Sequence, residues 1–143
     1  MDPSSPQREA RYRTAAELAL APAAAAAVDS PSAYGTTFGL LADLAAGATQ
    51  VVVVVPDAAA STEVRALAAR VRSEVAPGLV VAVVDDSSAR AFAEAGFELF
   101  AGRRSTPGPT SETSLATAYV CRDFVCRLPV TDVASLDREL AQA

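Results

Sequence analysis

The sequence predicts an α/β fold in which an N-terminal helical hairpin precedes a small domain whose elements run β-α-β-α-β-β-α. Two observations support this class. Helix-forming residues with apolar spacings of three and four fill the first third, and two β-branched runs typical of buried parallel strands follow. Helix start and stop signals separate the later elements. We expect a disordered start over residues 1–7, the hairpin over 8–48 and the α/β domain over 49–143.

The hairpin is predicted from two helix-forming segments. The first runs from Glu9 to about Asp29, and Pro22 should kink or split it. Ser30 as N-cap and Pro31 at the first helical position then start a second helix that ends near Ala46, with Gly47 as its C-cap. The apolar residues of the second helix are Tyr34, Phe38, Leu41 and Leu44.

A β-α-β unit is predicted next. Val51–Val55 is the first buried strand, and Pro56-Asp57 ends it. Ser61 or Thr62 caps a helix that runs through Val75, and Pro77-Gly78 stops it before a second strand over residues 79–84. The residues of this helix expected to face inward are Val64, Leu67, Ala68 and Val71.

The remaining elements are short. Asp85-Asp86-Ser87 opens a helix to about Ala95, which Gly96 closes, and Gly102 to Ser114 is the longest loop. Strands Thr117–Cys121 and 124–128 form a hairpin around a tight turn at Arg122-Asp123. Pro129 ends the pairing, and Thr131 caps the last helix. The inward residues of that helix are Val133, Leu136 and Leu140.

Composition excludes several classes of function. The 143 residues contain no histidine, so Ser-His-Asp and Cys-His nucleophile systems and HExxH zinc sites are excluded. A net charge of -5 argues against nucleic-acid binding, and Arg103-Arg104, the only adjacent basic pair, is expected to be a solvated loop pair. The longest strongly apolar run, Val51–Val55, is far shorter than the roughly 20 residues that span a membrane.

A cytoplasmic location and no bound cofactor are expected. The basic and alanine-rich N-terminal region imitates a signal peptide, but Glu17 and Pro22 interrupt its apolar part. The chain contains neither G-x-G-x-x-G nor a P-loop motif to hold a phosphate. Asp57, Asp85 and Asp86 follow the two parallel strands, where ligands often bind, but turn and cap roles explain them, so we interpret them as structural.

The two cysteines, Cys121 and Cys126, form the candidate redox or disulfide pair. Two thiols supply half of a zinc site, so no metal site is predicted. A disulfide needs Cα atoms about 4.4–6.8 Å apart, which the two ends of a tight hairpin can meet. Two reduced thiols are the alternative, and cytosolic chemistry favours them. No catalytic residue is assigned.

The order of elements in the second part is that of a thioredoxin core, without its redox motif. Pro56-Asp57-Ala58-Ala59 stands where a Cys-x-x-Cys pair would open the first helix, and no proline immediately precedes the strand at Thr117. The similarity is therefore one of shape.

The C-terminal segment carries a resemblance to a known family. Residues 118–132 read AYVCRDFVCRLPVTD, and Leu136 and Leu140 follow them. This string resembles the closing segment of the thioredoxin domain-containing proteins that include spermatogenesis-associated protein 20 and its bacterial relatives. Upstream, Val51–Asp57 resembles that family's hydrophobic strand ending in Asp, and residues 8–47 resemble its last barrel helices.

The resemblance implies a part of a longer architecture. Family members carry a thioredoxin-like domain, then an (α/α)₆ toroid similar to six-hairpin glycosidases and sugar epimerases, then a tail like this one. Only Cys121 and Cys126 map onto the family's motif, so the resemblance supplies no catalytic residue.

The expected function is therefore that of a C-terminal domain or fragment with a structural or docking role and no catalysis of its own. Its hairpin would expose an apolar strip and pair with parent-protein domains or a second copy. Two alternatives stay open: a small thiol-redox protein using Cys121 and Cys126, and a carbohydrate-binding or epimerase-like remnant.

Overall fold

The protein has the predicted α/β class, with N-terminal helices followed by a four-stranded mixed sheet and a small two-stranded sheet. The structure is a computed structural model that describes residues 6–57, 61–110, 113–122 and 125–142. Residues 1–5 of the predicted disordered start lie outside these residues, whereas residues 6 and 7 belong to the first helix, which begins at Pro6.

The hairpin consists of α1 (Pro6–Asp29), a 3-10 turn η1 (Pro31–Tyr34) and α2 (Gly35–Ala46). Of the predicted kink or split at Pro22, the split is wrong, because α1 continues through this residue. Proline removes one hydrogen bond to the carbonyl four residues earlier, that of Leu18, and Leu18 lies on the exposed side of the helix. Ser30 occupies the predicted N-cap position directly before Pro31, at the start of η1, but its side chain makes no capping hydrogen bond. Gly47 ends α2 with φ 77°, as predicted.

The main sheet has the strand order β2-β1-β5-β6. Its strands are β1 (Thr49–Val55), β2 (Leu79–Asp85), β5 (Thr117–Arg122) and β6 (Val125–Cys126). β1 pairs in parallel with β2 and antiparallel with β5, so the valine run lies at the centre of a mixed sheet instead of an all-parallel one. Burial on both faces still follows, since Val51–Val54 are fully buried.

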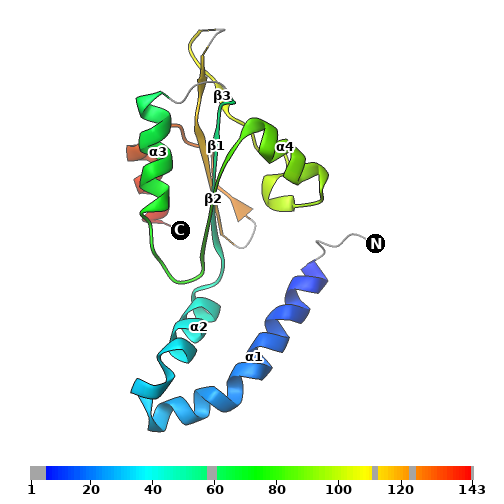
Figure 1. Cartoon of the computed structure of the whole chain (residues 1–143), viewed down its shortest axis with the longest axis vertical. Helices are drawn as coiled ribbons and strands as arrows, with labels where there is room; N and C mark the ends of the chain where they lie inside the picture. The colour runs from blue at the N-terminus through cyan, green and yellow to red at the C-terminus, as the bar shows by residue number, and fades with distance from the viewer. Residues whose placement is uncertain (1–5, 58–60, 111–112, 123–124, 143) are drawn as a thin grey trace.

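Helices cover both faces of this sheet (Figure 1). α3 (Thr62–Arg72) and α5 (Val133–Leu140) lie on one face, and α4 (Asp86–Glu94) lies on the other, followed by a 3-10 turn η2 (Glu98–Phe100). One core cluster joins Val51 and Val53 to the α3 and α5 side, and a second joins Val52 and Val54 to Phe100 on the α4 side. The alternation of valines between the two clusters follows from the two-residue period of a strand.

Most predicted helix signals are confirmed, with two corrections. Ser61 Oγ accepts a hydrogen bond from the Val64 N–H at 3.3 Å, and the four inward residues predicted for α3 are all buried. However, α3 ends at Arg72 and Val75 is 90% exposed. The last helix is capped by Asp132 and not by Thr131, because the Asp132 carboxylate accepts from the Ser135 N–H at 2.8 Å.

The C-terminal hairpin and the long loop also differ in detail from prediction. β5 and β6 pair antiparallel as expected, but β6 covers only Val125–Cys126 of the predicted 124–128. Residues 123 and 124, including half of the predicted turn, lie outside the described residues. The predicted loop contains a short strand, β3 (Thr106–Pro107), which pairs with β4 (Ser114–Leu115).

The helical hairpin is joined to the sheet at one end (Figure 1). The Gly78 N–H donates to Asp43 Oδ1 at 2.9 Å, and Arg122 Nη2 donates to the Ala46 carbonyl at 2.9 Å. Gly78 has φ +68°, and a Cβ atom there would collide with the Gly47 carbonyl oxygen. Two glycines therefore allow the end of α2 and the start of β2 to approach closely.

Candidate functional site

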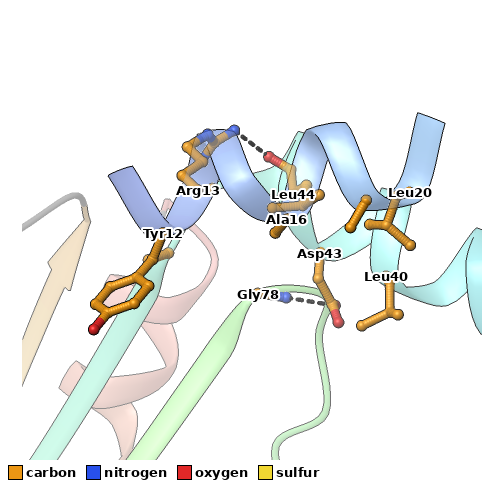
Figure 2. A pocket seen from close by; sticks show the side chains of 11 residues that line it. Tyr12, Arg13, Ala16, Leu20, Leu40, Asp43, Leu44 and Gly78 are labelled. Carbon is orange, nitrogen blue, oxygen red and sulfur yellow. Dashed lines mark hydrogen bonds between the residues drawn. The ribbon is translucent and has the colours of Figure 1, made fainter. Parts of the chain in front are cut away.

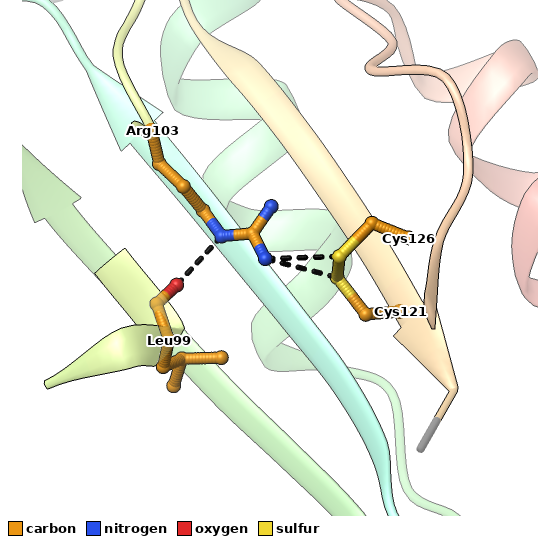
Figure 3. The surroundings of a disulfide bond; sticks show 4 residues. All are labelled: Leu99, Arg103, Cys121 and Cys126. Atoms are coloured by element: carbon orange, nitrogen blue, oxygen red, sulfur yellow. Dashed lines mark hydrogen bonds between the residues drawn. A yellow bond between two sulfur atoms is a disulfide. The ribbon is translucent and has the colours of Figure 1, made fainter. Parts of the chain in front are cut away.

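The two cysteines lie opposite each other on β5 and β6 and form a disulfide bond (Figure 3). The Arg127 N–H donates to the Val120 carbonyl at 3.0 Å, so Cys121 and Cys126 occupy a non-hydrogen-bonded pair, where opposite side chains are closest. Their Cα atoms are 3.9 Å apart. Cys121 is 1% exposed, whereas Cys126 is exposed at the edge of the sheet.

Arg103 contacts both sulfur atoms (Figure 3). Its Nη2 lies 3.2 Å from Cys121 Sγ and 3.0 Å from Cys126 Sγ. Its Nε donates to the Leu99 carbonyl at 2.6 Å, and its guanidinium lies 4.9 Å from the centre of the Tyr119 ring. The guanidinium is thus held on three sides: by a carbonyl, by an aromatic face and by the disulfide.

The backbone around Arg103 is fixed by two further side chains. The Tyr119 hydroxyl donates to the Arg104 carbonyl at 2.7 Å and accepts from the Arg104 N–H at 3.2 Å. Asp86 accepts from the Ser105 N–H at 2.8 Å and from the Ser105 hydroxyl at 2.6 Å. The loop that follows η2 is therefore anchored to both β5 and α4, which positions Arg103.

The charge of Arg103 is poorly solvated. Burial lowers the pKa of its guanidinium, and no carboxylate of the described residues forms an ion pair with it. A buried cation is ordinarily paired with an anion. The site therefore holds a positive charge that a negatively charged sulfur could balance.

Gln50 is a buried polar residue on β1, the strand next to Cys121. It is paired with Cys121 in the β1–β5 register, so their side chains project from the same face of neighbouring strands. Gln50 is 8% exposed, and its Oε1 has no hydrogen-bond partner among the residues described. An unpaired buried acceptor costs about 1–3 kcal/mol.

A cavity of about 240 Å³ lies beside Arg103. Its lining residues are Asp86, Arg90, Ala93, Phe100, Gly102, Arg103 and Arg104. The charged residues of this lining are three arginines and Asp86, so positive charges outnumber negative ones around the cavity.

The three aspartates at the strand ends accept hydrogen bonds within the fold. Asp57 accepts from the Ser87 N–H at 2.9 Å, and Asp85 caps α4 by accepting from the Ser88 N–H at 2.6 Å. The Ser88 and Ser87 hydrogen bonds lower the pKa of Asp85. Asp86 anchors the loop that carries Arg103, as described above.

A second cavity, of about 450 Å³, lies where the helical hairpin meets the domain (Figure 2). Apolar side chains from both helices line it, among them Tyr12, Ala16, Leu20, Leu40 and Leu44. At its edge, Arg13 Nη2 donates to the Leu44 carbonyl at 2.6 Å and ties α1 to α2. This cavity is open to solvent, since Tyr12 and Leu40 are 61% and 46% exposed.

Sequence reasoning found the cysteine pair but missed its neighbours. The expectation that Arg103-Arg104 is a solvated pair is wrong for Arg103, which is half-buried against the disulfide. Arg103 is 18 residues from Cys121, and no local pattern links the two. Gln50 did give a signal, because it is a polar residue directly before a run of five valines.

No group of three or more His, Cys, Asp or Glu residues suited to a metal occurs in the described part of the chain. None of the helices in that part combines the length and the apolar character needed to cross a membrane. No protein-family model, curated protein or solved structure matches this sequence.

Proposed function

We propose that this chain is a C-terminal docking module of a protein built like the thioredoxin domain-containing family, and that its helical hairpin packs against other helices of such a protein. The resemblance of residues 118–132 to that family's closing segment supports the proposal. The module has a structural role and no catalysis of its own.

The observation that carries the proposal is the exposed apolar surface of the hairpin. Among its residues whose side chains are described, only Ala27 is buried, while large apolar side chains are exposed on both helices. These are Tyr12, Leu18, Val28, Phe38 and Leu40. Helices in proteins are stabilised mainly by burying one face, so a hairpin this exposed favours an additional partner.

The shape of the hairpin indicates the kind of partner. In the view of Figure 1, α1 and α2 meet at η1 and separate toward the sheet. Residues of both helices line the 450 Å³ cavity. The cavity presents Leu20 of α1 and Leu40 of α2 to the same space. A neighbouring helix that inserts apolar side chains there, as helices of an (α/α) toroid do against each other, would cover both residues.

The first test uses two matched variants of the hairpin. Leu40→Asp places a charge in the cavity, and Leu18→Asp places the same charge on an exposed position outside its lining. We expect the wild-type chain to self-associate in light scattering and to show fast hydrogen exchange in α1. Leu40→Asp should reduce the association more than Leu18→Asp does, because Leu40 lines the cavity that the partner helix would fill and Leu18 does not. A monomeric wild type whose α1 amides are as protected as those of β1 would contradict the docking function.

The second test is the neighbouring DNA. We expect a reading frame upstream that encodes a thioredoxin-like segment and a helical toroid. Its product, made separately, should bind the wild-type chain more tightly than Leu40→Asp. The carbohydrate-binding alternative stays a prediction, and a panel of sugars that gives no thermal shift would contradict it.

A further inference from the structure

We propose that the Cys121–Cys126 disulfide is a thiol-exchange site, at which low-molecular-weight thiols reduce the protein and Arg103 holds the released Cys121 thiolate. This inference concerns the edge of the sheet and is independent of the docking function of the hairpin.

The two sulfur atoms differ in access. Cys126 is exposed on β6, a two-residue edge strand, whereas Cys121 lies on β5 and is 1% exposed. Thiol exchange proceeds by attack of a thiolate on one sulfur while the other leaves with the electron pair. The exposed Cys126 Sγ is therefore the sulfur that is attacked, and Cys121 Sγ is the leaving group.

Two exchange steps complete the reduction. In the first, an external thiolate forms a bond to Cys126 Sγ, the Cys121–Cys126 bond breaks, and Cys121 Sγ takes the electron pair as a thiolate. In the second, another external thiolate attacks the external sulfur of the mixed disulfide and releases Cys126. Two external thiols are oxidised to one disulfide, and the protein disulfide takes up the two electrons. Of the two protons the thiols supply, one stays on the cysteine pair and one goes to solvent.

Arg103 lies against both sulfur atoms before the reaction begins, so it is in place for the one that leaves as a thiolate. Its Nη2 is 3.2 Å from Cys121 Sγ and 3.0 Å from Cys126 Sγ, and its orientation is fixed by the Leu99 carbonyl and the Tyr119 ring. The difference in exposure between the two cysteines, and not Arg103, selects Cys121 as the leaving group. A disulfide sulfur is neutral, so the oxidised form leaves the half-buried guanidinium without an anion. The thiolate supplies that anion, and a nearby arginine lowers a cysteine pKa.

Gln50 provides a second, independent observation at the same place. Its buried Oε1 lacks a hydrogen-bond donor, and its register partner is Cys121. A thiolate at Cys121 accepts hydrogen bonds, and the Gln50 side-chain amide carries two N–H donors beside its oxygen. Reduction therefore adds an acceptor beside a buried amide, which can turn its N–H group toward the thiolate.

The experiment measures the equilibrium between the oxidised full-length chain and dithiothreitol, together with the pH dependence of alkylation of the reduced thiols. We compare wild type with Arg103→Gln, Arg103→Lys and the control Arg127→Gln. Arg127 neighbours Cys126 in sequence, but its guanidinium bonds to Glu139 and Gln142 instead. The wild-type pair should titrate below the ordinary cysteine pKa of about 8.5.

Arg103→Gln should make the disulfide about tenfold harder to reduce, which is about 30 mV for a two-electron couple, and should raise the alkylation midpoint. Arg103→Lys should restore part of the effect, and Arg127→Gln should match wild type. A potential and a midpoint in Arg103→Gln that equal those of wild type would overturn the proposal, as would wild-type thiols that titrate with the ordinary pKa.

Gln50→Leu keeps the proposal testable if Arg103 variants fold poorly. This change removes the unpaired oxygen from the oxidised form and the N–H donor to the Cys121 thiolate from the reduced form, so both effects should make the disulfide harder to reduce. A Gln50→Leu disulfide that is easier to reduce than wild type would contradict the role of Gln50. Failure of the hairpin variants to alter association would leave these thiol measurements unaffected, so the two proposals fail separately.

Discussion

At the scale of single residues, Gly78 shows how one missing side chain sets the junction between the hairpin and the domain. Its φ of +68° lies in the left-handed region, and its absent Cβ leaves room for the Gly47 carbonyl. The same residue donates its N–H to Asp43. The left-handed backbone conformation, the close approach of the Gly47 carbonyl and the hydrogen bond to Asp43 therefore all depend on Gly78.

Gly78→Ala should destabilise the protein. The left-handed conformation alone costs an alanine about 1–2 kcal/mol, and the collision with Gly47 adds to this. Gly39→Ala is the matched control, because a Cβ there meets nothing within 4 Å and alanine is favoured over glycine inside a helix by about 1 kcal/mol. Urea unfolding should show a loss for the first variant and a small gain for the second. Equal stabilities of the two variants would contradict this account of the junction.

The disulfide site shows the limit of residue-level prediction. The cysteine pair was visible because the residues lie five positions apart in a predicted hairpin. Arg103 was not visible, because its approach depends on the loop that Asp86 and Tyr119 hold in place. A contact made through the folding of a distant loop leaves no spacing in the sequence to detect.

At the scale of elements, the features that depend on the sequence pattern within one helix or strand could be predicted. The inner face of α3 follows from the helical period, and burial of the valine strand on both faces follows from its uninterrupted apolar run; both predictions were confirmed. The elements that were missed, η2 and the β3–β4 pair, have two or three residues per segment and too little length for a period. The mixed direction of the sheet was also missed, because the pairing of β1 with β5 joins segments far apart in the chain.

The N-cap of α5 should make stability depend on pH. Hydrogen bonds from the Ser135 hydroxyl and N–H lower the pKa of Asp132. A carboxylate whose folded-state pKa is depressed adds stability above its unfolded value of about 3.9, and that stability is lost as the pH falls through the lower folded value. Wild type should therefore exceed Asp132→Asn in unfolding free energy at pH 7, and the difference should shrink below about pH 4.

Ser135→Ala tests the cause of that shift. It removes the hydroxyl donor and keeps the backbone N–H, so the pH-dependent part should become smaller without disappearing. Chemical denaturation at several pH values measures all three proteins. A difference between wild type and Asp132→Asn that is constant from pH 7 to pH 3 would show that the carboxylate charge does not contribute.

At the scale of the whole molecule, the hairpin gives the chain an elongated form. α1 and α2 extend from one end of the sheet and leave the helix-covered faces of the domain to α3, α4 and α5 (Figure 1). A compact domain of this length would have a radius of gyration of about 14–15 Å. Small-angle scattering of a dilute sample should therefore give a larger value, and a value near 15 Å would show that the hairpin folds against the domain in solution.

The strand order leaves β2 as the outermost strand, which has a consequence for handling the protein in solution. No strand in the described part of the chain pairs with its outer edge, and it reads LVVAVVD, with no charge before Asp85 and no proline. Val80 is 48% exposed there. An unprotected apolar edge strand can pair with the edge strand of another molecule and form an intermolecular sheet. A lysine on the edge opposes this pairing. Val80→Lys should therefore slow the rise in turbidity of concentrated samples, because association of the protein depends on this edge.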